Sequence, residues 1–245
     1  MIDFHTHILP GIDDGSRDID MTEKMLEMEQ AMGVSYICAT PHFYAHRRSV
    51  QTFLDRREGA LAEVRELLAR RPELPQITAG AEVYYFAGMG RAEQLPELCI
   101  EGTDILLLEM PFEQWTDEVY RDVRNIVKKR GLRVVLAHVE RYEALQRHRS
   151  VWEEVLGMPL TIQMNAGSFT AGLTSGMHAR HTSKFCLGMM ESYDNCIIGS
   201  DCHNLTDRAP NVDEARRTIE KKLGAGRLER LDQYTEELLG ITKKR

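Results

Sequence analysis

Short apolar runs of four or five residues recur along the chain, and the longer stretches between them place apolar residues every three or four positions. The short runs lack the alternation of a half-exposed strand, which is typical of strands buried on both faces. The longer stretches have the period of amphipathic helices. Predicted strands are the opening residues, 36–39, 76–79, 105–108, 134–137 and 196–200. Predicted helices cover about 20–32, 53–68, 117–130, 148–156, 179–193, 211–223 and 227–239.

Strand and helix therefore alternate throughout, which predicts an α/β fold with a parallel sheet covered by helices. About seven such repeats within one chain of this length suggest that the sheet closes into a TIM-like barrel. An open doubly wound sheet is the alternative, but that fold usually has a glycine-rich turn after its first strand. Residues 9–15, Leu-Pro-Gly-Ile-Asp-Asp-Gly, contain no G-x-G-x-x-G motif. The pattern favours the barrel.

Composition supports a single domain spanning residues 1–245. The chain has 42% hydrophobic residues, enough for a full core, and no linker or repeat divides it. No signal segment precedes the first strand and no apolar run approaches membrane-spanning length, so we expect a cytoplasmic protein. The five cysteines show no C-x-x-C spacing and are expected to be reduced thiols. The charged end Thr242–Arg245 is expected to contribute solvation alone.

The net charge of -7 argues against non-specific nucleic-acid binding, which depends on a basic surface. Bound cations would neutralise part of this negative charge. The expected partners therefore include no nucleic acid and no membrane. The amphipathic helices leave a homo-oligomer open.

Candidate chemistry begins with His5-Thr6-His7 at the end of the first predicted strand. Because side chains alternate along a strand, both imidazoles project from the same face, as metal ligands would. Such pairs also occur as ordinary packing residues, so the motif alone does not decide. The same arrangement returns, however, at later strand ends. The further residues of this kind are His42, Glu82, Glu109, His138, Asp201 and His203.

In parallel barrels the active site lies at the carboxyl ends of the strands, so one pocket is expected to collect all of these side chains. Nitrogen and carboxylate oxygen without thiolate suit Mn, Fe or Zn at sites that keep open positions. Eight or nine such groups are too many for one ion. Two or three divalent ions would accommodate them, an arrangement that commonly hydrolyses phosphate esters.

Several segments together resemble the polymerase and histidinol phosphatase (PHP) superfamily, and in particular its bacterial tyrosine-protein phosphatases of the capsule and exopolysaccharide type. The resemblance spans roughly residues 1–210 in order. The H-E-R-Y-like and S-D-x-H-N-L segments favour that phosphatase branch over histidinol phosphatase. The segments are His5-Thr6-His7, Asp13-Asp14-Gly15, Thr40-Pro41-His42, Gly80-Ala81-Glu82, Glu109, His138-Val139-Glu140-Arg141-Tyr142 and Ser200-Asp201-Cys202-His203-Asn204-Leu205.

The resemblance implies a distorted (β/α)7 barrel with a three-metal centre, with manganese the most expected ion and iron or zinc remaining open. It also implies how the ligands divide. One ion would be held by His5, His7, Glu82 and Asp201, and a second by the bridging Glu82 with Glu109 and His138. The third would be held by Asp14, His42 and His203, although the adjacent Asp13 competes with Asp14 because a loop gives no facing rule.

The hypothesis that follows is a metal-dependent phosphoric monoester hydrolase acting on phosphotyrosine. A metal-bound hydroxide would attack phosphorus in line, while Arg141 and Arg208 stabilise charge on the non-bridging oxygens. The implied substrate is a phosphotyrosine protein, a bacterial tyrosine kinase that regulates polysaccharide synthesis. A histidinol-phosphatase-like or other small-molecule phosphoesterase on the same site is the alternative, and a non-enzymatic regulator is a third class.

Two other patterns remain. Cys202 and Arg208 have the C-x5-R spacing of cysteine-dependent tyrosine phosphatases, but no glycine lies between them to form a phosphate cradle. The segment Phe43–Arg48 is basic and aromatic, and it is expected to form a lip that receives a phosphopeptide. His46, His148, His178 and His181 lie away from predicted strand ends and are expected to have no role in the site.

Overall fold

The computed structural model describes residues 1–171 and 175–241, so the charged end Thr242–Arg245 lies outside the described residues. Every strand pairing in this part of the chain is parallel. The strands form two sheets, in the orders β1-β2-β4 and β3-β5-β6-β7-β8-β9. Their bounds are β1 Ile2–Thr6, β2 Tyr36–Ala39, β3 His42–Phe43, β4 Gln76–Ala79, β5 Glu82–Tyr84, β6 Ile105–Glu109, β7 Arg133–Leu136, β8 Thr161–Asn165 and β9 Cys196–Gly199.

Two of the strands are interrupted rather than separate. β2 runs into β3 across Thr40-Pro41, and β4 runs into β5 across Gly80-Ala81, while β2 pairs with β4 and β3 with β5. Pro41 has no N–H with which to continue a ladder, so the interruption falls where the sequence requires it. When each pair is counted as one strand, the nine segments within the described residues become seven.

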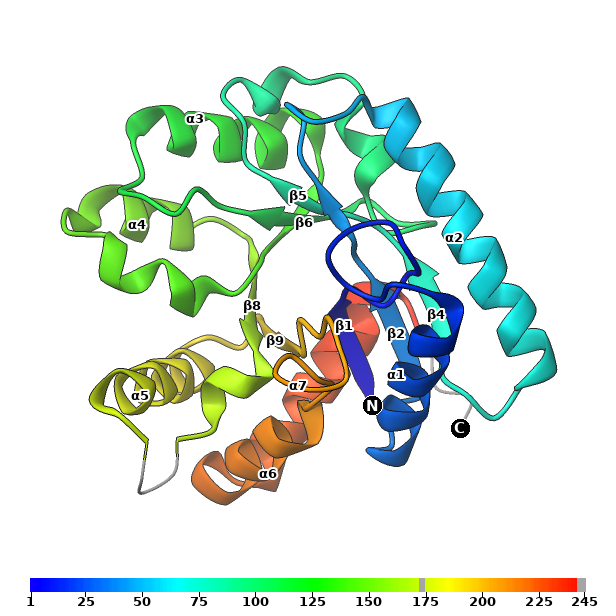
Figure 1. Cartoon of the computed structure of the whole chain (residues 1–245). Helices are drawn as coiled ribbons and strands as arrows, with labels where there is room; N and C mark the ends of the chain where they lie inside the picture. The colour runs from blue at the N-terminus through cyan, green and yellow to red at the C-terminus, as the bar shows by residue number, and fades with distance from the viewer. Residues whose placement is uncertain (172–174, 242–245) are drawn as a thin grey trace.

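The two sheets meet at β1 and β9, which closes the ring. The amide of Asp201 donates to the carbonyl of His5 at 2.8 Å, the amide of His7 donates to the carbonyl of Cys202 at 2.9 Å, and Thr6 and Cys202 form a parallel bridge. Figure 1 shows the strands around the centre of the molecule with the helices outside them. The expected distorted barrel of parallel strands is confirmed.

Seven α-helices within the described residues follow the predicted order. Two begin at side-chain caps: the Asp18 carboxylate accepts from the amide of Met21, and the Ser49 hydroxyl accepts from that of Thr52. The helix predicted over 117–130 is α-helical only over Asp117–Asn125 and continues as a π-helical turn over Ile126–Arg130. The helices are α1 Ile19–Ala31, α2 Val50–Arg70, α3 Asp117–Asn125, α4 Arg149–Leu156, α5 Met177–Ser192, α6 Val212–Leu223 and α7 Ala225–Leu239.

The amino-terminal end of the ring is closed by the last helix. Leu238 of α7 packs with Phe4, Leu107 and Ile197, which point into the ring from three strands. The carbonyl of Leu238 also accepts a hydrogen bond from Arg133 Nη1 at 2.8 Å, at the start of β7. Because this end is filled by apolar packing, the opposite end, where the strands finish, is left for polar side chains.

The sequence did not predict β8, Thr161–Asn165, although its five residues are all buried. The structure adds this strand between β7 and β9, where it pairs with both. Each of the five cysteines is a free, buried thiol, as expected. No helix formed by the described residues is long and apolar enough to cross a membrane.

Candidate metal centre

The nine side chains predicted as metal ligands come together at the carboxyl ends of the strands. Seven of them are buried, whereas the His42 side chain is 14% exposed and that of Asp14 is 68% exposed. Each comes from a strand end or from the loop just after a strand. They are His5 and His7 from β1 and the residue following it, Asp14 from the next loop, His42 and Glu82 from the first positions of β3 and β5, Glu109 from the last of β6, His138 from just after β7, and Asp201 and His203 from just after β9.

His5 and His7 face one another through their Nε2 atoms. His7 Nδ1 lies 2.7 Å from the Asp13 carboxylate and His5 Nδ1 lies 3.2 Å from Gln163 Oε1, so in the neutral imidazoles the ring protons belong on Nδ1. The two Nε2 atoms, 3.2 Å apart, then carry only lone pairs. Two facing lone pairs repel unless a cation or a proton lies between them.

Two carboxylate oxygens converge on the same point. Glu82 Oε2 lies 3.4 Å from Nε2 of both His5 and His7, and Asp201 Oδ1 lies 3.7 and 3.3 Å from them. Four groups that accept hydrogen bonds therefore surround one position, deep in the protein. Two imidazole nitrogens and two carboxylates form a donor set that suits Mn, Fe or Zn.

Glu82 links this position to its neighbours. Its Oε1 lies 2.8 Å from His138 Nε2, and its Oε2 lies 2.8 Å from His42 Nδ1. Glu109 Oε1 is 3.5 Å from the same His138 nitrogen. Glu82 Oε2, Glu109 Oε2 and His42 Nδ1 are buried without a hydrogen-bond partner of good geometry. The two oxygens of the Glu82 carboxylate thus face different imidazoles, which is the arrangement expected of a ligand that bridges two ions.

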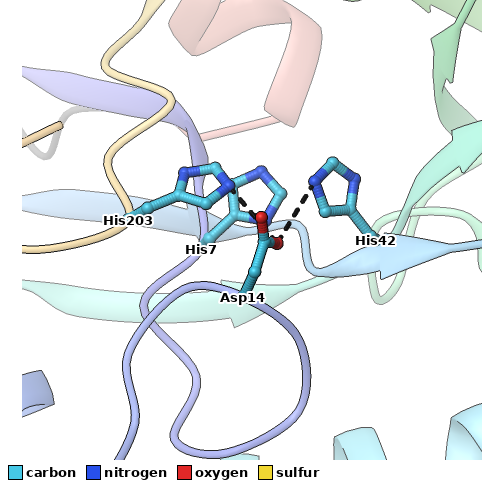
Figure 2. Close-up of side chains that lie close together, drawn as sticks. All are labelled: His7, Asp14, His42 and His203. Atoms are coloured by element: carbon cyan, nitrogen blue, oxygen red, sulfur yellow. Dashed lines mark ion pairs between the residues drawn. The ribbon is translucent and has the colours of Figure 1, made fainter.

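A third group lies at the mouth of the site. Donor atoms of His7, Asp14, His42 and His203 all lie within 4.8 Å of one another. Figure 2 shows the Asp14 carboxylate between the other side chains, with its Oδ1 at 3.5 Å from His42 Nε2 and 3.7 Å from His203 Nε2. These distances exceed hydrogen-bond length, which leaves room for an ion between the atoms.

The adjacent Asp13 has a different place. Its carboxylate accepts from His7 Nδ1 at 2.7 Å, from the amide of His42 at 2.9 Å and from the amide of Gly15 at 3.0 Å. It therefore orients one imidazole of the site and fixes the loop, as the partners of metal-bound histidines commonly do. Of the two neighbouring acids, Asp14 faces the histidines directly and Asp13 holds them from behind.

Backbone geometry at the site is unusual in two places. His138 has φ 31° and Asp201 has φ 54°, which makes them the non-glycine residues of positive φ within the described chain. This region is unfavourable for residues with a Cβ and is seen mainly where function demands it. Each of them lies two positions after the last residue of a strand, where the backbone turns at the carboxyl end of the ring.

Three residues that sequence reasoning did not select support the site. Gln163 Oε1 accepts from the amide of His138 at 2.7 Å as well as facing His5. Asn165 Nδ2 donates to Asp201 Oδ2 at 2.8 Å, and the Tyr142 hydroxyl lies 3.0 Å from His138 Nδ1. Gln163 and Asn165 belong to β8, which no continuous apolar run marks. Its signal is the alternation of Leu160, Ile162, Met164 and Ala166 with polar residues, which is the period of a strand.

The two predicted phosphate-binding arginines both contact Asp201. Arg141 Nη2 donates to Asp201 Oδ2 at 2.6 Å, and Arg208 Nη2 donates to Asp201 Oδ1 at 2.9 Å. Each guanidinium side chain is a little over one third exposed. They therefore lie between the buried donor groups and the solvent, where a phosphate entering the site would meet them.

The electrostatics of the centre are strongly negative. Burial alone would lower the pKa of His7, but Asp13, together with the other nearby carboxylates, raises that pKa well above its usual value. Burial would lower the pKa of His138, but the carboxylates of Glu109 and Glu82 outweigh it and raise this pKa to about 9. An environment that attracts protons to imidazole so strongly also attracts a metal cation.

Aromatic side chains surround the opening. The Tyr44 ring lies 5.2 Å from that of His42 and 5.6 Å from that of Tyr84. On the other side, Phe112 stacks on His138 with ring centroids 5.9 Å apart and planes at 23°. Phe112 is 46% exposed, which is unusual for a large apolar residue. An exposed apolar ring at this opening is available to contact a bound molecule.

Cys202 is poorly suited to act as a nucleophile. Its side chain is fully buried, and its thiol approaches Glu29 Oε1 at 4.0 Å, away from the opening. Burial, with Glu29 and Asp3 adding to it, raises the pKa of this thiol well above its usual value. A neutral thiol behind the site argues against the cysteine-dependent alternative.

The remaining histidines lie outside the cluster. His181 pairs with Glu143 at 3.2 Å on the surface, and the His46 ring lies 5.9 Å from that of Tyr44. His148 and His178 contribute backbone carbonyls to hydrogen bonds with Gln114 and Thr182. The candidate ligand groups found in the described part of the chain include none of these four.

A parallel strand ring with a polynuclear donor set at its carboxyl end is typical of metal-dependent hydrolases. The profile of the family described as "Capsular polysaccharide synthesis, CpsB/CapC" matches residues 1–238, and the chain belongs to this family. This confirms the resemblance drawn from the sequence motifs.

Named relatives agree over nearly the whole chain. The tyrosine-protein phosphatase CpsB of Streptococcus agalactiae serotype V is 27% identical, with 94% of each chain covered. The tyrosine-protein phosphatase YwqE of Bacillus subtilis is 26% identical, with 92% of this chain and 86% of the relative covered.

A solved structure also matches. It belongs to a study of YwqE from Bacillus subtilis and CpsB from Streptococcus pneumoniae, described there as metal-dependent tyrosine phosphatases. It superposes with a TM-score of 0.83 at 23% identity, and covers 99% of this chain and 96% of that one. At that identity the likeness establishes the fold.

Proposed function

We propose that this protein is a metal-dependent protein-tyrosine phosphatase that hydrolyses phosphotyrosine. The observation that carries the proposal is the convergence of His5 Nε2, His7 Nε2, Glu82 Oε2 and Asp201 Oδ1 on one buried position, with distances of 3.2–3.7 Å across the nitrogen pair and the nitrogen–oxygen pairs. Its family membership and the names of its relatives give the reaction class.

The donor groups fit two to three divalent ions. We infer that His5, His7, Glu82 and Asp201 hold the first, that Glu82 bridges to a second held with Glu109 and His138, and that Asp14, His42 and His203 hold the third. His7 also belongs to the outer group by distance. Manganese is the ion we expect, with iron or zinc possible by ligand type. Bound ions would supply Lewis acidity and an activated water.

The chain's own groups bind and orient the substrate. Arg141 and Arg208 are placed to bind the non-bridging phosphate oxygens, exchanging their contacts with Asp201 for contacts with the substrate. Phe112 and Tyr84 are placed to contact the phenyl ring. A phenol leaves with a pKa of about 10, so it needs less protonation than an alkoxide does. The lack of an assigned general acid is compatible with a tyrosyl substrate for this reason.

The biological setting is inferred from the family. We propose that residues 1–245 form one catalytic domain that acts in the cytoplasm on a bacterial tyrosine kinase controlling capsule or exopolysaccharide synthesis. The family description and the relatives' names support the link to capsule. The amphipathic helices allow association into a homo-oligomer, and sedimentation analysis measures that state directly.

The test combines metal analysis with substrate choice. Purified protein is assayed on a phosphotyrosine peptide and on histidinol phosphate, before and after chelation and again after manganese is restored. We expect two to three ions per chain and peptide hydrolysis that chelation removes and manganese returns. Preference for histidinol phosphate would move the protein to the small-molecule class. Metal-free protein with thiol-dependent activity would contradict the proposed site.

A further inference from the structure

A cavity with three arginines in its wall opens beside the candidate metal centre. It has a volume of about 510 Å³, and its charged lining consists of Arg47, Arg48 and Arg56 together with Asp13 and Asp14, next to His42. Two candidate metal ligands thus form part of its wall. A substrate bound beside Asp14 and His42 would therefore also face three guanidinium groups.

The positive charge of this cavity is not neutralised within the protein. No ion pair joins Arg47, Arg48 or Arg56 to an acid among the residues that the structure describes. Arg48 Nη1 is buried without a hydrogen-bond partner, and Arg56 Nη2 donates to the neutral carbonyl of Gly11 at 2.9 Å. Arg47 and Arg56 are exposed and Arg48 is half-buried, so the buried Nη1 of Arg48 is the donor that most needs an acceptor from outside.

The acids near these arginines have other partners. Asp13 accepts from His7, from the amide of His42 and from the amide of Gly15. Burial first, and then the charge of Arg56, lower the pKa of Arg48, while the charge of Asp13 opposes this change. The cavity is therefore suited to an anion that the protein does not itself provide.

The spacing places this anion close to the phosphotyrosine. The Tyr44 ring lies 5.2 Å from the His42 ring, and the Arg47 guanidinium lies 4.6 Å above the Tyr44 ring. An extended peptide advances about 3.3–3.6 Å per residue. A side chain one to three residues from the phosphotyrosine can therefore cover the separation between His42 and Arg47 that these two contacts connect. Guanidinium groups bind carboxylate and phosphate oxygens in bidentate fashion.

We propose that the cavity lined by Arg47, Arg48 and Arg56 is a specificity subsite for an anionic residue that flanks the phosphotyrosine in the substrate protein. This inference rests on the proposed phosphatase function and deepens it. The shared chemistry is an oxygen anion on a neighbouring side chain, either a carboxylate or a second phosphate. It gives the basic, aromatic segment Phe43–Arg48 a defined role.

The test compares three phosphotyrosine peptides on the manganese-loaded protein. One has neutral flanking residues, one has glutamate at the three positions on each side, and one has phosphoserine at the same positions. We expect kcat/KM to be at least tenfold higher for both anionic peptides than for the neutral one, mainly through a lower KM. The phosphoserine peptide distinguishes a phosphate requirement from a carboxylate one. Raising the salt concentration should reduce the preference.

Variants assign the preference to the cavity. In Arg47→Gln/Arg48→Gln we expect the anionic-to-neutral ratio of kcat/KM to fall below twofold. Arg47 is exposed, so the single variant Arg47→Gln serves if the double variant does not fold. The matched control is Arg70→Gln, which removes the same charge from the far end of α2, and in which the ratio should be unchanged.

The outcomes separate the two proposals. Equal kcat/KM for all three peptides in the unmodified protein would overturn the subsite and leave the phosphatase function standing. A tenfold preference that survives in Arg47→Gln/Arg48→Gln would also overturn the assignment to this cavity. Failure to hydrolyse any of the peptides, with manganese bound, would overturn the proposed function and the subsite together.

Discussion

Asp201 joins the buried donor groups to the groups that face the substrate. Its Oδ1 lies 3.3 Å from His7 Nε2, while its Oδ2 accepts from Arg141 at 2.6 Å and from Asn165 at 2.8 Å. Burial would raise the pKa of Asp201, but the imidazoles of His5 and His7 outweigh it and hold this pKa well below its usual value. Asp201 therefore remains ionised. The position of Arg141 thus depends on the same carboxylate that we assign to an ion.

Replacing Arg141 tests whether the guanidinium acts on the substrate. Arg141→Ala should lower kcat/KM on a phosphotyrosine peptide by about 10²-fold or more, since a preorganised donor to a developing charge is removed. Manganese content should not change, because Arg141 is not among the proposed ligands. Arg141→Lys keeps the charge but loses the bidentate geometry, and should recover only part of the activity. Turnover within twofold of the unmodified protein in the alanine variant would exclude the assigned role.

A buried carboxyl group behind the site predicts a specific pH dependence. Burial first, and then the neighbouring Asp3, raise the pKa of Glu29 well above its usual value. The ordinary pKa of a glutamate is about 4.3. Above that pH, residue 29 loses its proton in the unfolded chain but keeps it in the folded protein. Folding then binds a proton, so stability falls as pH rises, by about 1.4 kcal/mol per pH unit, up to the folded pKa.

The variant Glu29→Gln removes this proton linkage. We expect the difference in free energy of unfolding, variant minus unmodified protein, to increase from pH 5.5 to pH 7.5. The unmodified protein loses stability over this range because its folded state must keep a proton on Glu29, whereas glutamine binds no proton. Urea unfolding at three pH values, with chelator present in every sample, measures the difference. Parallel pH profiles for the two proteins would show that Glu29 has an ordinary pKa.

At the residue level, the sequence indicated which side chains would meet but not how each is held. Eight of the nine candidate ligands were accessible because each lies at or just after the end of an apolar strand, whereas Asp14 came from the family resemblance alone. The fold brings all nine together, and their role as ligands stays a prediction. The choice between Asp13 and Asp14 was not accessible. It depends on a contact between Asp13 and His7 Nδ1, which the path of the loop creates and no spacing rule reveals.

At the level of elements, apolar periodicity predicted the helices and most strands. It did not find β8, because Thr161, Gln163 and Asn165 are polar and yet buried. Their burial is possible because each has a hydrogen-bond partner: Tyr234 for Thr161, His138 and His5 for Gln163, and Asp201 for Asn165. Ile162 and Met164, between these polar residues, pack in the hydrophobic core, so the strand shows apolar residues only at alternate positions and forms no continuous apolar run.

The junction of β1 with β9 leads to a prediction about the ring. A Cβ at Gly199 would lie 2.5 Å from His5 Cβ and 2.8 Å from the His5 nitrogen, so the strands approach closely only because residue 199 is glycine. Gly199→Ala should destabilise the protein by about 1–3 kcal/mol through overpacking. It should also weaken manganese binding, because His5 must shift.

The matched control is Gly59→Ala in α2, where an added Cβ meets nothing within 4 Å. That change should raise stability by roughly 0.5–1 kcal/mol, because alanine is the better helix former. Urea unfolding and metal titration of both variants give the comparison. Normal manganese binding in Gly199→Ala would show that the close approach of β1 and β9 does not position His5.

At the level of the whole molecule, the candidate ligands connect most of the ring. Glu82 from β5 faces imidazoles that belong to β1, β3 and the segment after β7, and Asp201 follows β9. Without a cation, the acids in this buried cluster repel one another, and protons on the imidazoles must offset their charge. Ion binding should therefore stabilise the fold as a whole and not only the site.

This stabilisation is measurable as a shift in the thermal midpoint. Free manganese at 100 times its Kd should add about 2.7 kcal/mol, which for a chain of this size corresponds to roughly 5–10 °C. Glu82→Gln removes the charge of the proposed bridging ligand and should lose most of the shift. Asp14→Asn changes only the exposed candidate ligand of the outer group and should lose less of it. Identical midpoints with chelator and with manganese in the unmodified protein would show that these nine side chains do not form a metal centre.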